Sequence, residues 1–280
     1  MSSARGCLAL ELLGVPVRLE CDDPELERRL ELCYARLATP HGNGRANGSV
    51  ALDAALRRAG ASWKIQVSGR DACSASDPLA ALRTLNHELL QGLMLRARSF
   101  FFVHAAVLEW QGRGIVLPGL SRAGKSTLAL ALLLEGARFL SDELLAFDPA
   151  RRSARALPRA LKIRDECVGY FPELARSFQG TGEGRFLPFA ALRPDVLADE
   201  VPIAAVIVPR WSEVQELRLE PISRGAALLA LAESSLNFGT HRQESLDRLA
   251  DLVREARTLA LAWHEPRAAA RAVVRELERP

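Results

Sequence analysis

The feature that most constrains the fold of this chain is the segment 119–126, which reads Gly-Leu-Ser-Arg-Ala-Gly-Lys-Ser and is followed by Thr127. It fits the complete pattern G-x-x-x-x-G-K-[ST], in which glycines allow sharp bends and successive backbone N–H groups wrap phosphate oxygens. Such a loop lies between a strand and a helix, because the helix N-terminus adds the positive end of its dipole. The segment therefore predicts an α/β domain that binds a nucleotide.

The residues on either side of the loop supply this frame. Residues 99–110, SFFFVHAAVLEW, are β-rich, and QGRG then turns the chain into a second strand at 114–118, as in a hairpin. After the loop we expect a helix over 125–135 that is ended by Gly136, and a further strand in RFLSDE, 138–143. Strand, loop, helix and strand follow one another in the order that a phosphate-binding loop requires.

Each residue type in the loop has a chemical reason. Lys125 would reach the β and γ phosphates of ATP, and the hydroxyl of Ser126 would hold Mg²⁺. The basic residues are almost all arginine, and the only lysines are Lys64, Lys125 and Lys162. A lysine kept where a compact ammonium is useful carries more weight in such a chain. We expect the nucleotide to contact the whole loop: Gly119, Leu120, Ser121, Arg122, Ala123, Gly124, Lys125, Ser126 and Thr127.

An acidic pair, Asp142 and Glu143, stands seventeen residues beyond Lys125, at the end of the strand expected after the loop helix. In a sheet of this kind that strand end lies beside the phosphate loop. Carboxylates can hold the Mg²⁺ of the nucleotide, together with Ser126, and can accept the proton of an incoming hydroxyl. The alternative is an exposed Asp-Glu turn, and the preceding loop favours the functional reading.

A histidine, His104, lies inside the apolar run FFFVHAAVL. In such a position a histidine is more often a hydrogen-bonded core residue than a catalytic one. The strand alone leaves both roles open.

With these residues the chain resembles the catalytic domain of HPr kinase/phosphorylase and its relatives, which include kinases of ribosomal-peptide clusters such as lasso-peptide precursor kinases. The resemblance covers roughly residues 98–170 well. It rests on His-Ala at 104 and 105, GLSRAGKST at 119–127, EGARFLSDE at 135–143 and LKIR at 161–164. It implies a P-loop kinase domain of the HPr kinase/PEP carboxykinase-like α/β type, with a mixed sheet.

The resemblance also implies roles for single residues. Asp142 would take the proton from a substrate hydroxyl, and His104 would help to set the charge of that aspartate. Glu143 and Ser126 would serve Mg²⁺, and Arg164 would lie near the transferred phosphate. The catalytic residues implied in this way, with the loop lysine, are His104, Lys125, Asp142 and Arg164.

Two departures from the family pattern bear on the acceptor. The family has Asp-Asp where this chain has Asp142-Glu143, and Leu-Glu-x-Arg-Gly where residues 161–165 read Leu-Lys-Ile-Arg-Asp. Lys162 reverses the charge at a position where the family has an acid, so Lys162 and the neighbouring Arg159 would neutralise phosphate charge instead. The peptide-tailoring relatives often have lysine at this position, which favours an acceptor other than HPr.

The rest of the chain predicts a small α+β N-terminal unit over 1–75, a linking helix over 76–97 that starts at Asp77-Pro78, and the catalytic domain over 98–280. In the catalytic domain we expect later strands at 144–148, 155–157, 203–208, 215–220 and 258–263, and helices at 165–176, 223–234, 242–256 and 266–278.

Composition and charge indicate which classes of binding partner are expected. The net charge is +3, with acids and bases mixed along the chain, so we expect no nucleic acid partner. The five cysteines form no CxxC pair and are expected to be reduced. No signal peptide and no run of 18 apolar residues is seen, so we expect a cytoplasmic protein without a membrane association. A homo-oligomer is expected only by analogy with the family.

The favoured function is transfer of the γ-phosphoryl group of ATP, with Mg²⁺, to a serine or threonine hydroxyl of a peptide or small protein. Two alternatives stay open at this point. One is a kinase that uses the same site on a small metabolite, and the other is an ATP-binding regulatory module that transfers nothing. Intact Asp142, Glu143 and His104 argue against the last, because a module that only binds needs no positioned base.

Overall fold

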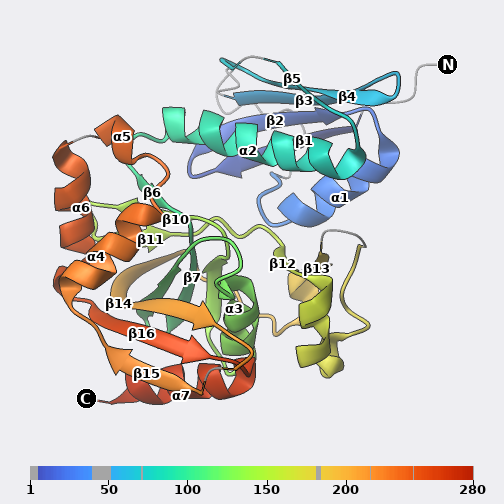
Figure 1. The fold of residues 1–280 in the computed structure, drawn as a ribbon. Coiled ribbons are helices and arrows are strands. Elements are labelled where there is room, and N and C mark those ends of the chain that lie inside the picture. Colours follow the sequence, from blue (N-terminus) through green and yellow to red (C-terminus); the bar gives the residue numbers. More distant parts are fainter. Residues whose placement is uncertain are drawn as a thin grey trace. The chain divides into compact units, whose positions relative to one another are not determined.

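The computed structural model describes residues 6–39, 52–70, 72–180, 184–214, 216–241 and 243–279. The chain divides into two compact units, Met1–Arg98 and Ser99–Pro280, which are drawn in Figure 1.

The N-terminal unit is a five-stranded sheet with two helices. Its strands follow one another in the sheet as β1 (Gly6–Leu12), β2 (Val15–Cys21), β3 (Leu52–Ala59), β4 (Ser62–Val67) and β5 (Cys73–Ala75). Helix α1 (Pro24–Tyr34) contacts β1 and β2, and α2 (Pro78–Arg96) contacts β3, β4 and β5. The hydroxyl of Tyr34 donates to Asn86 Oδ1 at 2.6 Å, which joins the two helices on one face of the sheet.

The two helices begin where the sequence indicates. Asp23 accepts hydrogen bonds from the N–H groups of Glu25 and Leu26, and Asp77 accepts one from Ala80. Each cap is followed by a proline, whose missing N–H costs nothing in the first turn. The helix expected over 76–97 therefore exists, and its packing on β3 to β5 makes it part of the N-terminal unit.

The C-terminal unit contains residues 119–126, which the sequence predicts to bind phosphate and which are called the phosphate loop after that prediction. Its strands are β6 (Phe101–Val103), β7 (Ala105–Trp110), β8 (Arg113–Pro118), β9 (Arg138–Ser141), β10 (Leu145–Asp148), β11 (Ser153–Arg155), β12 (Leu161–Ile163), β13 (Arg185–Leu187), β14 (Glu200–Trp211), β15 (Arg218–Pro221) and β16 (Arg257–Trp263). Its α-helices are α3 (Lys125–Leu134), α4 (Arg224–Glu233), α5 (Phe238–His241), α6 (Gln243–Arg254) and α7 (Pro266–Glu278).

Nine of these strands form one mixed sheet. Its main path runs β6-β10-β11-β14-β8-β7-β9, and β16 pairs with both β14 and β15. Strand β14 is parallel to β8 and to β16, whereas β7 is antiparallel to both β8 and β9. Because parallel strands end at the same edge of a sheet, the carboxyl ends of β8, β14 and β16 meet where the phosphate loop begins.

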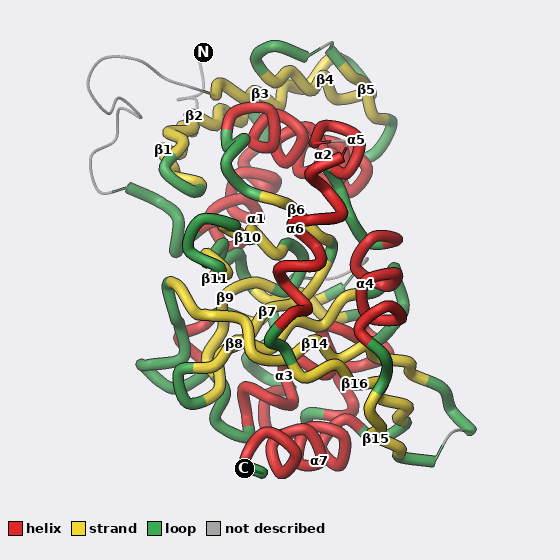
Figure 2. Tube along the Cα trace, turned by 90° about the vertical axis from the view of Figure 1, so that its left-hand side faces the viewer, coloured by secondary structure: helices red, strands yellow, loops and turns green. Residues whose placement is uncertain are grey.

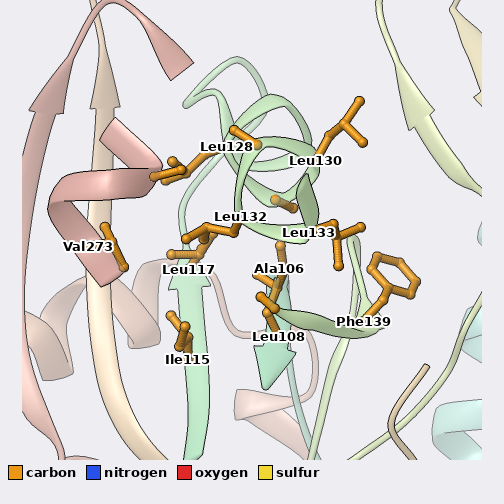
Figure 3. Packing of buried hydrophobic residues seen from close by; sticks show 14 of the residues in the cluster. Ala106, Leu108, Ile115, Leu117, Leu128, Leu130, Leu132, Leu133, Phe139 and Val273 are labelled. Carbon is orange, nitrogen blue, oxygen red and sulfur yellow. The ribbon is translucent and has the colours of Figure 1, made fainter. Parts of the chain in front are cut away.

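Helices cover both faces of this sheet. On one face α3 and α7 pack over apolar side chains of β7, β8 and β9, among them Leu108, Leu117 and Phe139 (Figure 3). On the other face α4 and α6 pack over Val107, Val116 and Val206; Figure 2 shows α6 in front of the sheet. Burial on both faces explains why β7 and β8 read as almost continuous apolar runs.

Most elements expected from the sequence are confirmed. The hairpin of β7 and β8 turns at Gln111 and Gly112, both with positive φ, as a tight two-residue turn requires. The helix expected at 165–176 is wrong, because the chain forms two short 3₁₀ helices, Asp165–Tyr170 and Pro172–Leu174. Pro172 accounts for the break, because it lacks an N–H and disfavours the helical conformation in the residue before it.

A short segment, residues 234–237, lies along β6 and is hydrogen-bonded to Phe102 and His104. The N–H of His104 donates to Ser234 O at 2.7 Å, and the N–H of Leu236 donates to Phe102 O at 2.9 Å. Asn237 is buried and fixes the segment, because its Oδ1 accepts from Phe102 N at 2.9 Å and its Nδ2 donates to Phe100 O at 3.1 Å.

We expect Asn237→Ala to lower the free energy of unfolding by about 2 kcal/mol, because the buried N–H of Phe102 loses its acceptor. Urea denaturation measures this loss, and faster hydrogen exchange at the amide of Phe102 would locate it. Asn86→Ala is the matched control, because it removes a hydrogen bond of the N-terminal unit and should leave that amide unchanged. An unaltered urea midpoint for Asn237→Ala would contradict the prediction.

Candidate active site

The phosphate loop connects the end of β8 to the start of α3. Gly119 and Gly124 have φ of +149° and +84°, in the region that glycine tolerates best. Arg122 also has a positive φ, +74°, which is uncommon for a residue with a side chain and marks a strained position in the loop. Leu120, Ser121 and Arg122 are exposed, so the middle of the loop faces solvent.

The N-terminus of α3 has no side-chain cap, although α1, α2, α4 and α7 are each capped by a side chain. The first N–H groups of α3 therefore stay available to an anion, and the helix dipole favours one there. Lys125 stands in the first turn. It is buried, and its Nζ donates to the carbonyl oxygens of Gly119 at 2.7 Å and Leu120 at 3.0 Å.

The acidic pair follows β9. Ser141 Oγ accepts from the N–H groups of Glu143 at 3.4 Å and Leu144 at 3.1 Å, which turns the chain at the end of the strand. Asp142 Oδ2 accepts from the backbone N–H of Lys162 at 3.3 Å, and Glu143 Oε2 pairs with Arg159 Nη1 at 2.7 Å. The segment 159–162 is thus held against the two acids by one hydrogen bond and one ion pair.

The pKa values of the two acids are shifted in opposite directions by their surroundings. Burial, reinforced by the charge of Glu143, raises the pKa of Asp142 to about 7. The charge of Arg159 does most to lower the pKa of Glu143, with smaller contributions from His104, Lys162 and Lys125. Neighbouring carboxyl groups thus differ in their proton affinity, so that Glu143 stays an anion while Asp142 can gain or lose a proton near neutral pH.

Two basic groups that interact with the acids, Lys125 and His104, have lowered pKa values. Burial lowers the pKa of Lys125 to about 8, although the charges of Asp142 and Glu143 oppose this shift. Burial, followed by the charge of Lys125, also lowers the pKa of His104. Perturbed groups that interact with one another are typical of functional sites.

The structure therefore brings together most residues that the sequence singled out. His104, Lys125, Asp142, Glu143 and Arg159 interact through their charges. Ser126 and Thr127 follow Lys125 in the first turn of α3. Arg164 is near enough to lower the pKa of Lys125, and its guanidinium pairs with Glu166 at 3.3 Å. The ammonium of Lys162 lies 5.9 Å from the centre of the Phe186 ring.

Two tryptophans beside the loop were not singled out from the sequence. A Cβ atom placed on Gly124 would overlap the ring of Trp263 and would lie 3.2 Å from Trp211 Cβ. Both side chains come at the ends of apolar strands, where a sequence pattern predicts core residues. The pairing of β14 with β16 places the two tryptophans opposite each other, and both lie against Gly124 of the loop.

The donors fit the groups that the loop implies. Magnesium is usually bound by one or two carboxylates together with phosphate oxygens, and Asp142, Glu143 and the Ser126 hydroxyl are donors of that kind. Among the residues that the structure describes, no group of three or more His, Cys, Asp or Glu side chains is placed to hold a metal ion by itself. A nucleotide would supply the remaining oxygens.

Comparisons with known proteins add little to this geometry. No family model matches the chain, and no curated protein matches it. Among solved structures it is similar to the Hpr(Ser) kinase/phosphatase from Coxiella burnetii, with 14% identity over 64% of this chain and 99% of that chain and a TM-score of 0.33. A TM-score this low assigns neither family nor activity.

No helix in the described part of the chain is both long and apolar enough to cross a membrane.

Proposed function

We propose that the C-terminal unit is an ATP-dependent phosphoryl transferase. More particularly, we propose a kinase of the HPr kinase-like type that phosphorylates a serine or threonine of a peptide or small protein. The observation that supports it best is the charge interaction of the loop lysine, which stands in the uncapped first turn of α3, with the acids at 142 and 143. A phosphate-binding loop alone would fit many nucleotide-binding proteins, whereas a proton-accepting carboxylate beside it fits transfer.

In this proposal the backbone N–H groups of the loop hold the β and γ phosphates, and Lys125 exchanges its two carbonyl partners for phosphate oxygens. Bound Mg²⁺, held by Glu143, Asp142 and Ser126, would neutralise phosphate charge. Asp142 orients the acceptor hydroxyl and takes its proton as the oxygen attacks the γ-phosphorus in line with the leaving β-γ oxygen. His104, which interacts with Glu143 and Lys125, would help to set the charge of Asp142.

The basic residues of the segment 159–164 neutralise charge that develops on the transferred group. Arg159 already balances Glu143, the backbone N–H of Lys162 donates to Asp142, and the charge of Arg164 acts on Lys125. A peptide or protein acceptor is favoured because Lys162 stands where relatives that tailor peptides often carry lysine.

A direct test incubates the purified protein with γ-labelled ATP and Mg²⁺ and three kinds of acceptor: peptides with a serine or threonine, the same peptides with alanine there, and a mixture of hydroxylated metabolites. We expect label only in the first set, as an acid-stable phosphate ester. Label in the metabolites would favour the small-molecule alternative. Tight ATP binding without transfer to any acceptor, under conditions in which the protein is folded, would favour a regulatory module.

Glu143→Gln is expected to raise the Mg²⁺ concentration needed for half-maximal turnover by about tenfold, because the amide keeps the shape and loses the charge. A titration of initial rate against Mg²⁺ at saturating ATP measures it. Glu244→Gln is the matched control, because Glu244 is an exposed acid on α6 that pairs with Arg248. If both variants share the wild-type Mg²⁺ dependence, Glu143 does not serve the metal.

A further inference from the structure

We propose that Trp211 forms the nucleobase subsite of this protein, where a purine ring lies against its indole. The inference rests on the proposed nucleotide-dependent function and adds a residue and a direction to it. The carboxyl ends of the parallel strands β8, β14 and β16 lie next to the loop.

Strand β14 extends beyond β8. Its pairing with β8 includes Val206 opposite Val116, two residues before β8 ends at Pro118. Its pairing with β16 continues to Trp211 opposite Trp263, the last residues of both strands. The two tryptophans therefore stand at the carboxyl edge of the sheet, beside the loop that follows β8.

Contact with the loop is direct. Gly124, the residue before Lys125, packs so closely on the Trp263 ring that a Cβ atom there would overlap it, and Trp211 Cβ is the next nearest neighbour. Trp263 is fully buried, and its ring packs against Gly124 of the loop. Trp211 is half-buried and retains surface that a ligand can reach.

The order of the strands gives the direction of the nucleotide. From β8 the sheet continues to β7 and β9 on one side, where Asp142 follows β9, and to β14 and β16 on the other side. A triphosphate in the loop with its γ group toward Asp142 directs its α-phosphate, ribose and base toward β14. On that side Trp263 is fully buried, whereas Trp211, the aromatic residue of β14, is only half-buried.

The chemistry of the region suits a base. Trp211 Nε1 donates to His264 O at 3.3 Å, so the indole is held in one orientation. The turn after β14 carries Val214, whose side chain is 94% exposed and apolar. A flat aromatic surface binds a nucleobase by stacking, whatever the edge of the base carries.

The test compares ATP with inorganic tripolyphosphate, both with Mg²⁺, by titration calorimetry. Trp211→Ala is expected to raise the Kd for ATP by about tenfold and leave the Kd for tripolyphosphate unchanged, because only ATP has a base to stack. Trp211→Phe should retain most of the ATP affinity. Trp110→Ala is the matched control, because Trp110 is a half-buried tryptophan of the same unit that lies at the far end of β7.

Each outcome of these titrations tests either the nucleobase subsite or the proposed function. Equal losses for ATP and tripolyphosphate in Trp211→Ala would mean that Trp211 only supports the loop, and the subsite is then wrong. Wild-type protein that binds neither ligand would overturn the proposed function itself. If Trp211→Ala does not fold, wild-type fluorescence remains: ATP, but not tripolyphosphate, should quench it, and Trp211→Phe should lose that quenching. Equal quenching by the two ligands would also overturn the subsite.

Discussion

Asp142→Asn is expected to lower kcat by about a hundredfold to ten-thousandfold, the usual contribution of a general base, while the Kd for ATP changes little. The amide keeps the size of the carboxyl and can still accept the N–H of Lys162. It cannot take a proton from an attacking hydroxyl. Single-turnover transfer of label from ATP measures the rate, and calorimetry with ATP and Mg²⁺ measures binding.

The protonation of Asp142 supplies an independent check that the variant is folded. Its pKa is raised from 3.8 to about 7, so the folded protein holds this proton more tightly than the unfolded chain. The site therefore loses stability as the pH rises from about 4 to about 7. A neutral amide at this position would carry no such cost, and at pH 8 without Mg²⁺ the Asp142→Asn variant should melt at or above the wild-type Tm.

Asp195→Asn serves as the control, because Asp195 is an exposed acid that pairs with Arg193. Near-normal turnover in Asp142→Asn, or a loss of turnover that Asp195→Asn shares, would refute the role of Asp142 as base.

Gly124→Ala is expected to weaken ATP binding by about a hundredfold, and transfer with it. An added methyl group would overlap the buried Trp263 ring, and the residue would also have to keep a φ of +84°. A strained backbone position of this kind costs about 1–3 kcal/mol, and every 1.4 kcal/mol is tenfold in affinity. Because Trp263 is fully buried, we expect the loop to shift instead. Calorimetry with ATP and Mg²⁺ measures the loss.

The chain offers a matched control for this change. Gly112 has a φ of +78° in the turn between β7 and β8, and a Cβ there would meet nothing within 4 Å. Gly112→Ala therefore carries the backbone strain without the collision and should leave ATP binding intact. The double variant with Trp263→Phe, which removes the overlapped part of the ring, should recover part of the affinity. Loss of binding in Gly112→Ala as well would show that general destabilisation is the cause.

The sequence predicted the frame of the loop because every signal there is local. The glycines, the apolar run of α3 and the turn at Gln111-Gly112 act within a few residues. In the structure the charges of the acids at 142 and 143 act on the loop lysine, and only one helix and one strand separate these residues in the chain. Local patterns failed at 165–176, where apolar spacing suggested a helix that Pro172 divides.

Contacts between distant segments could not be read from the chain. The pairing of β14 with β16 joins Trp211 to Trp263 across fifty-two positions, and neither tryptophan differs in sequence from an ordinary core residue. Asn237 is a similar case, because its hydrogen bonds to Phe100 and Phe102 depend on a segment that returns to β6 from far along the chain.

The hydrogen bonds of Lys125 to the carbonyl oxygens of Gly119 and Leu120 have a consequence for selectivity. A ligand can displace these two hydrogen bonds only if its own interactions with the ammonium are at least as favourable in free energy. Single small anions such as inorganic phosphate offer few compensating contacts, whereas a polyphosphate can engage the loop and the helix start at the same moment. The loop thus satisfies its own lysine, and we expect it to bind polyphosphates in preference to single phosphate ions.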